Sequence, residues 1–193
     1  MKKVVILVLM MLPVSVACPM FGGDNLFIVA AEGRYQDLWR VFNPTKLMFR
    51  DSFKRTPLHL AAMNGHDEMV AELISLGFEV DVCDGDGYTP LHWAAREGHA
   101  ECARILLEKG ANIDSKNRYE NTPLHLATLY GHIDCVYLFL ERGANYSIKN
   151  TTDRTPKNIA KDFKYKDIYD VIVAYEDDDQ QRAQYENILP FFC

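Results

Sequence analysis

The chain has 193 residues, 48% of them hydrophobic, and its formal net charge is −6, from 27 acidic against 21 basic side chains. This length and composition suit one ordinary globular domain. A net-acidic chain without a basic stripe is repelled by phosphate backbones and anionic lipid, which argues against nucleic acid as a partner.

Residues 1–17 have the pattern of an export signal. Lys2 and Lys3 form a positive start, an apolar stretch follows, and Ser15 and Ala17 supply small residues for a cleavage site. The apolar stretch is short for a bilayer, which takes about 20 residues. A buried N-terminal helix is the alternative interpretation. We therefore predict export to a bacterial periplasm or cell envelope, with secretion as the alternative.

Cys18 follows directly after the expected cleavage site, and residues 14–18, VSVAC, resemble a bacterial lipoprotein box. Ser15 stands where such boxes prefer a larger aliphatic residue, and Pro19 follows the cysteine, so plain cleavage is the preferred prediction. A lipid on Cys18 would anchor the protein to a membrane without spanning it.

The sequence of the central part of the chain repeats at a constant interval. Each repeat opens with a Thr-Pro pair, and these pairs begin at Thr56, Thr89, Thr122 and Thr155. The repeat is carried by the peptides TPLHLAAMNGH, TPLHWAAREGH and TPLHLATLYGH and by a glycine that closes each unit, at Gly77, Gly110 and Gly143. Over roughly residues 24–175 this pattern strongly resembles the ankyrin repeat family. The resemblance implies an all-α solenoid of stacked helix-turn-helix units with β-hairpin-like finger loops.

Each unit has the composition of two short helices. The Thr-Pro pair is a helix start, with proline at N1, where its missing N–H costs no hydrogen bond. Gly65 ends the first helix, and DEMVAELISL places Met69, Val70, Leu73 and Ile74 at helical spacing in the second. One such unit cannot cover its own apolar face, so neighbours must stack.

The units at the two ends depart from the pattern, as terminal repeats that face water do. The tail contains an acidic run and an apolar end at residues 188–192, and it is expected either to form an extra helix that covers the last unit or to be partly disordered. The expected segments are the signal peptide 1–17, a mature N-terminal segment 18–23, an N-capping repeat 24–55, repeats 56–88, 89–121 and 122–154, a C-capping repeat 155–175 and the tail 176–193.

All six histidines belong to the repeat, at the T-P-L-H and G-H positions. The family resemblance implies structural histidines that bond to the threonine and to loop backbone. Equivalent histidines of successive units should lie about 10 Å apart, which is too far to share one zinc ion. Cys102 and Cys135 occupy inward positions of the second helices, and Cys83 should be exposed. We therefore predict no catalytic residues, no metal site, no cofactor and no enzyme.

The resemblance implies that a concave face, made of finger loops and first helices, binds a partner protein. Tyr, Trp and Arg, the types enriched at binding hot spots, gather there in an expected exposed row, which also suggests a partner with an acidic patch. A core position is the alternative for Trp93. Lys54, Glu120 and Asp153 replace the usual finger glycine, so distorted turns are expected. The candidate partner-binding residues are Phe53, Arg55, Met63, Tyr88, Trp93, Arg96, Glu97, Arg118, Tyr119, Asn121, Leu129, Tyr130 and Arg154.

The sequence thus favours a monomeric, non-catalytic interaction module exported to the cell envelope. A secreted effector that acts on a host protein through the same face is the alternative. An enzyme that uses Cys83 or the acidic tail is the third hypothesis, and the sequence offers it no nucleophile–base pair.

Overall fold

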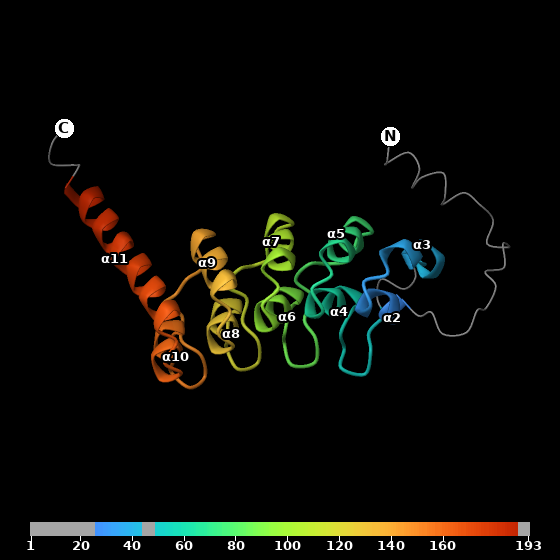
Figure 1. Cartoon of the computed structure of the whole chain (residues 1–193), viewed down its shortest axis with the longest axis horizontal. Coiled ribbons are helices and arrows are strands. Elements are labelled where there is room, and N and C mark those ends of the chain that lie inside the picture. The colour runs from blue at the N-terminus through green and yellow to red at the C-terminus, as the bar shows by residue number, and fades with distance from the viewer. Residues whose placement is uncertain (1–25, 44–48, 189–193) are drawn as a thin grey trace.

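The structure, a computed structural model, describes residues 26–43 and 49–188, with side chains described as far as residue 178. The predicted signal peptide, Cys18 and residues 189–193 lie outside this part of the chain. The described part is a single row of helix pairs (Figure 1), and it contains no β-strand.

The first helices of four successive units lie side by side along the row. They are α4 (Pro57–Met63), α6 (Pro90–Glu97), α8 (Pro123–Leu129) and α10 (Pro156–Asp162). Each begins after a threonine with proline at its first turn, and each has a capping box between that threonine and the residue three positions later. The predicted helix starts are confirmed.

The second helices form a parallel row on the far side from the loops (Figure 1). They are α5 (Asp67–Ser75), α7 (Ala100–Glu108), α9 (Ile133–Glu141) and the first part of α11 (Lys166–Ile188). The glycines that follow α5, α7 and α9 have φ values of 97°, 90° and 78°, the left-handed conformation that glycine adopts at low cost.

One hydrophobic core runs through all units, because each helix pair buries its apolar stripe against its neighbours. The fully buried side chains of α4 include Leu58, Ala61 and Ala62. Those of α5 are Met69, Val70 and Leu73, with exposed fractions of 1% or less. The paired alanines leave room for α4 to pack closely against α6. The all-helical solenoid expected from the repeat is thus confirmed.

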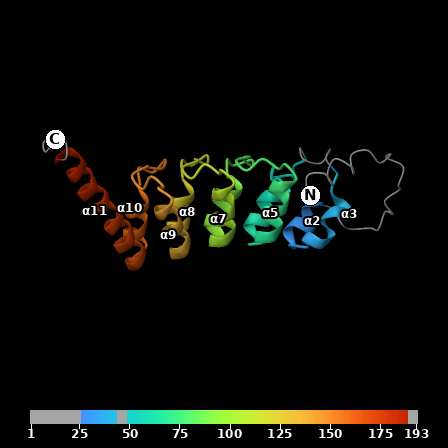
Figure 2. The same ribbon diagram turned by 90° about the horizontal axis from the view of Figure 1, so that it is seen from above.

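The ends of the row differ from its middle. The first unit has only α2 (Leu26–Ala31), the 3-10 helix η1 (Tyr35–Asp37) and α3 (Leu38–Val41). At the other end, α11 runs without a break from the last unit into the tail and projects away from the row (Figure 2). Its first half is fixed by buried Ile168 and Ile172 and by the ion pair of Lys157 with Glu176 at 2.6 Å. The apolar end of the tail at residues 188–192 lies outside the described side chains, so its contact with the last unit stays a prediction.

Candidate functional site

The loops that precede the first helices form four fingers on one side of the row, as Figure 1 shows. They comprise residues 51–55, 84–88, 117–121 and 150–154. Together with the C-terminal ends of α4, α6, α8 and α10 they make up a surface that we call the finger face. The candidate partner-binding residues all belong to these loops and first helices.

An aspartate or asparagine begins every finger and closes its turn. The Oδ1 atom of Asp84 accepts hydrogen bonds from the backbone N–H groups of Asp86 and Tyr88, both at 2.9 Å. The equivalent oxygens of Asp51, Asn117 and Asn150 accept the same two bonds in their own fingers. Sequence reasoning missed these residues, although their recurrence once in every repeat was the available signal.

The prediction of distorted turns at Lys54, Glu120 and Asp153 is wrong. These residues adopt φ values of 61°, 54° and 60°, close to the 80° of Gly87 in the second finger. The left-handed conformation costs a residue with a side chain about 1–2 kcal/mol. The two hydrogen bonds to the first residue of the finger offset that cost, since they fix the turn on both sides.

Neighbouring fingers are joined by backbone hydrogen bonds. Each bond runs from an N–H group of one finger tip to a carbonyl of the preceding tip, and the three bonds repeat with the period of the sequence. They are Gly85 N–H to Phe53 O (2.9 Å), Arg118 N–H to Asp86 O (3.0 Å) and Thr151 N–H to Tyr119 O (3.0 Å). This ladder holds the finger tips in a fixed row, so their side chains are positioned before any partner binds.

A cluster of three aromatic rings and one arginine occupies the centre of the finger face. The rings of Tyr88 and Trp93 lie 5.2 Å apart, and the indole Nε1–H of Trp93 donates to Asp84 Oδ2 at 3.0 Å. The Arg96 guanidinium carbon lies 4.9 Å from the Trp93 ring centroid and 5.4 Å from that of Tyr130 in the next unit. We call Tyr88, Trp93, Arg96 and Tyr130 the central cluster.

The structure divides the candidate residues by exposure. Six are exposed: Phe53, Glu97, Arg118, Tyr119, Tyr130 and Arg154. Seven are half-buried: Arg55, Met63, Tyr88, Trp93, Arg96, Asn121 and Leu129. The expectation of one exposed aromatic row is therefore wrong for Tyr88 and Trp93, because they pack on each other and Trp93 is held by Asp84. The exposed aromatic row consists of Phe53, Tyr119 and Tyr130, with exposed fractions of 66%, 49% and 46%.

Every arginine of the face lies close to a carboxylate. Arg55 pairs with Asp51 at 2.7 Å, Arg118 with Asp86, and Arg154 with Asp162 at 3.2 Å, while Arg96 Nε lies 3.5 Å from Glu97. The charges of the face are thus locally balanced. An acidic patch on the partner, expected from the arginines alone, has no free row of positive charge to meet.

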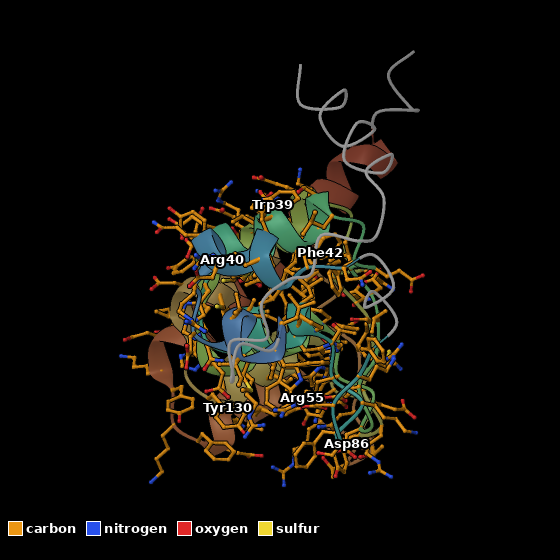
Figure 3. All side chains as sticks on the ribbon, turned by 90° about the vertical axis from the view of Figure 1, so that its right-hand side faces the viewer. Trp39, Arg40, Phe42, Arg55, Asp86 and Tyr130 are labelled. Carbon is orange, nitrogen blue, oxygen red and sulfur yellow. The ribbon has the colours of Figure 1, made fainter. Side chains whose placement is uncertain are left out.

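Sequence reasoning also missed an aromatic residue that extends the exposed row. Phe163 occupies the position of Tyr130 in the following unit, is 49% exposed, and stacks on Tyr165 at 6.0 Å between ring centroids. The period was the available signal, but the polar substitutions of the last unit hid it. Figure 3 places the labelled Arg55, Asp86 and Tyr130 together at one side of the molecule, opposite Trp39, Arg40 and Phe42.

The T-P-L-H histidines are structural, as predicted. The Nδ1 atom of His92 accepts the backbone N–H of Thr89 at 3.2 Å and contacts its hydroxyl at 2.9 Å, while Nε2 lies 2.9 Å from Asn121 O. His59 and His125 make the equivalent contacts. Burial lowers the pKa of His59 and of His92 to about 4 and also lowers the pKa of His125.

The G-H histidines bridge to the preceding unit. The Nε2 atoms of His66, His99 and His132 lie 2.9–3.2 Å from carbonyl oxygens of that unit's first helix. The His132 ring lies so close to Gly98 that a Cβ there would come within 2.5 Å of Nδ1. Both histidine rows therefore serve the scaffold. The described residues contain no group of three or more His, Cys, Asp or Glu side chains arranged to hold a metal ion.

The described cysteines are free thiols. Cys102 and Cys135 are buried in the second helices, as predicted, and burial raises the pKa of each to about 12. Cys83 is exposed, and burial of part of its side chain, together with Asp84 and Asp81, raises its pKa above the ordinary value. A thiol with a raised pKa is a poor nucleophile near neutral pH.

None of the described helices combines the length and the apolar character needed to cross a membrane. Two family models match the chain. The model described as ankyrin repeats (3 copies) matches residues 26–117, and the model described as ankyrin repeats (many copies) matches residues 106–160. No curated protein compared with the chain matches it.

Proposed function

The chain belongs to the ankyrin-repeat family, whose repeats are generally protein–protein interaction modules, and we propose that it binds one partner protein through the finger face without catalysing a reaction. The observation that carries the proposal is the exposed row of Phe53 and Tyr119 on fingers joined by the ladder, with Tyr130 at the C-terminal end of α8. Large aromatic side chains on a preorganised surface bind with little loss of conformational entropy.

The chemistry of the remaining candidates supports a non-catalytic role. The T-P-L-H histidines are engaged on both ring nitrogens, and the G-H histidines contact backbone carbonyls through Nε2. The buried thiols of Cys102 and Cys135 have raised pKa values, which disfavours the thiolate. A general base or an activated nucleophile requires a free, suitably titrating group.

We further propose that the protein is exported and cleaved after Ala17. Lys2 and Lys3, the apolar stretch behind them and the small residues Ser15 and Ala17 support this. The cell envelope is the proposed location, and Cys18 is the proposed attachment point if a lipid is added. Release into the medium would favour the effector role on a host protein.

Affinity capture with matched variants tests the binding proposal. Tyr119→Ala combined with Tyr130→Ala removes two exposed rings from the finger face, whereas Trp39→Ala combined with Tyr137→Ala removes two of similar exposure (54% and 43%) outside it. A partner identified by mass spectrometry should be lost only with the first variant. Equal retention by both variants would remove the finger face as the binding surface.

The mass of the mature N-terminus tests the export proposal separately. Cleavage after Ala17 gives a chain that begins at an unmodified Cys18, and lipid attachment adds a mass that fatty acids account for. A full-length chain recovered from the cytoplasm would contradict export, whatever the capture experiment shows.

A further inference from the structure

Resting on the proposed binding face, we infer that Arg96 of the central cluster forms a carboxylate-binding site, which receives an aspartate or glutamate side chain of the partner protein. Three observations lead to this inference: the guanidinium is held in place, it donates no hydrogen bond within the described residues, and neither nearby carboxylate lies close enough to satisfy it.

The guanidinium of Arg96 is held by aromatic rings from two units. Its carbon lies 4.9 Å from the Trp93 centroid and 5.4 Å from the Tyr130 centroid, within the range of a cation–π contact. The side chain is 34% exposed, so part of it stays open to a ligand. An arginine fixed in this way loses less rotamer entropy on binding, and its planar fork suits the two oxygens of a carboxylate.

The donors of Arg96 are unused within the described residues. Its Nε atom is buried without a hydrogen-bond partner, and the nearest carboxylate oxygen, on Glu97, stands 3.5 Å away. The other three face arginines differ, since Arg55, Arg118 and Arg154 have carboxylate contacts of 3.2 Å or less.

Two carboxylates lie near the cluster. Asp84 accepts two backbone N–H groups and the Trp93 indole, and Glu97 stands 3.5 Å from Arg96 Nε. The exposed part of the Arg96 guanidinium therefore has donors without a close acceptor, and a carboxylate, which only accepts, complements it.

This site differs from the acidic patch expected at the sequence level. The face carries no free row of positive charge, because its arginines have carboxylate neighbours. Recognition would come from one short-range, partly desolvated contact, in which a carboxylate meets Arg96 between the Trp93 and Tyr130 rings. Binding should therefore select a single acidic side chain at one position and depend only modestly on salt.

Peptide selection followed by a double-mutant cycle tests the inference. A phage-displayed library of random linear peptides is selected on the wild-type chain, and binding of the best peptide is measured by calorimetry. We expect one shared Asp or Glu, whose change to the amide weakens binding at least tenfold. Arg96→Gln should cause the same loss, and the two changes together should cost no more than either alone.

Matched variants separate recognition from folding. Arg104→Gln on α7 removes an arginine whose side chain is 40% exposed and pairs with Glu101 and Glu108, and it should leave peptide binding unchanged. Arg96→Lys keeps the charge but loses the planar fork, so it should bind as weakly as Arg96→Gln. Each variant should keep the wild-type helical spectrum and cooperative unfolding.

Two results would overturn the inference in different ways. Peptides that lose affinity on Phe53→Ala and Tyr119→Ala but not on Arg96→Gln would leave the finger face as the binding surface and remove the carboxylate site. If every selected peptide tolerates all of these variants, the carboxylate site and the proposed function both fail.

Discussion

Acidification from pH 7 to pH 5 should destabilise the fold strongly, because two buried histidines must stay neutral. His59 and His92 are fully buried, and the Nδ1 atom of each accepts a backbone N–H group. A proton on Nδ1 would face that N–H and break the capping box. Burial accordingly lowers the pKa of each histidine from an ordinary 6.5 to about 4.

The sign and size follow from proton linkage. Between pH 6.5 and pH 4 the unfolded chain binds protons at these positions and the folded chain does not, so the free energy of unfolding falls as the pH falls. The stabilisation is complete above about pH 6.5 and is lost toward pH 4. At pH 5 each histidine should account for a loss of about 2 kcal/mol, or about 4 kcal/mol together. His125, whose pKa is also lowered, adds to this.

Urea unfolding followed by circular dichroism, repeated from pH 7 to pH 5, measures the effect. His92→Asn is the matched variant, because Asn158 already fills this position in the last unit and accepts the N–H of Thr155 at 3.1 Å. The variant should lose about 2 kcal/mol of the wild-type pH dependence between pH 7 and pH 5. A free energy of unfolding that is equal at pH 7 and pH 5 would refute the reasoning, and so would an unchanged slope in the variant.

Three further outcomes are expected. Thr128→Val should raise the free energy of unfolding, measured in urea, by about 1 kcal/mol. The fully buried Thr128 hydroxyl has no hydrogen-bond partner in the described structure, and valine keeps the shape of the side chain. A lower free energy of unfolding in the variant would contradict this. Gly98→Ala should lower the free energy of unfolding by more than about 2 kcal/mol, since Gly98 has φ 81° and a Cβ there would meet the His132 ring. Gly110→Ala, with φ 90° and open space around it, should lower it by about 1 kcal/mol. Equal losses in the two variants would argue against the ring contact. Iodoacetamide should label Cys83 in the folded protein and reach Cys102 and Cys135 only in urea, as peptide mass spectrometry would show; labelling of Cys102 without urea would contradict the burial.

The fold could be predicted from the sequence because each unit repeats the same residues at its helix starts, packing positions and helix ends. Thr-Pro begins a helix, paired alanines allow close packing, and glycine ends the second helix, so the constant period defines the whole row. The two histidine rows followed from the same period. The resemblance to ankyrin repeats needed no long-range information.

The finger face was harder to predict, because its geometry depends on contacts between loops. The turns at Lys54 and Glu120 look strained from composition, and only the hydrogen bonds of Asp51 and Asn117 explain why they keep the common form. Some of the ion pairs that neutralise the arginines join different fingers, as Arg118 and Asp86 do. Their pairing cannot be deduced from helical spacing alone.

Photo-crosslinking in the native cell tests the central claim most directly. A photoreactive amino acid replaces Tyr119 or Tyr130 on the finger face, and Trp39 or Tyr137 outside it, all four being exposed side chains. If the finger face binds a partner protein, the first two positions should give one shared adduct and the other two should give none. An adduct at Trp39 or Tyr137, with none at Tyr119 and Tyr130, would contradict the account.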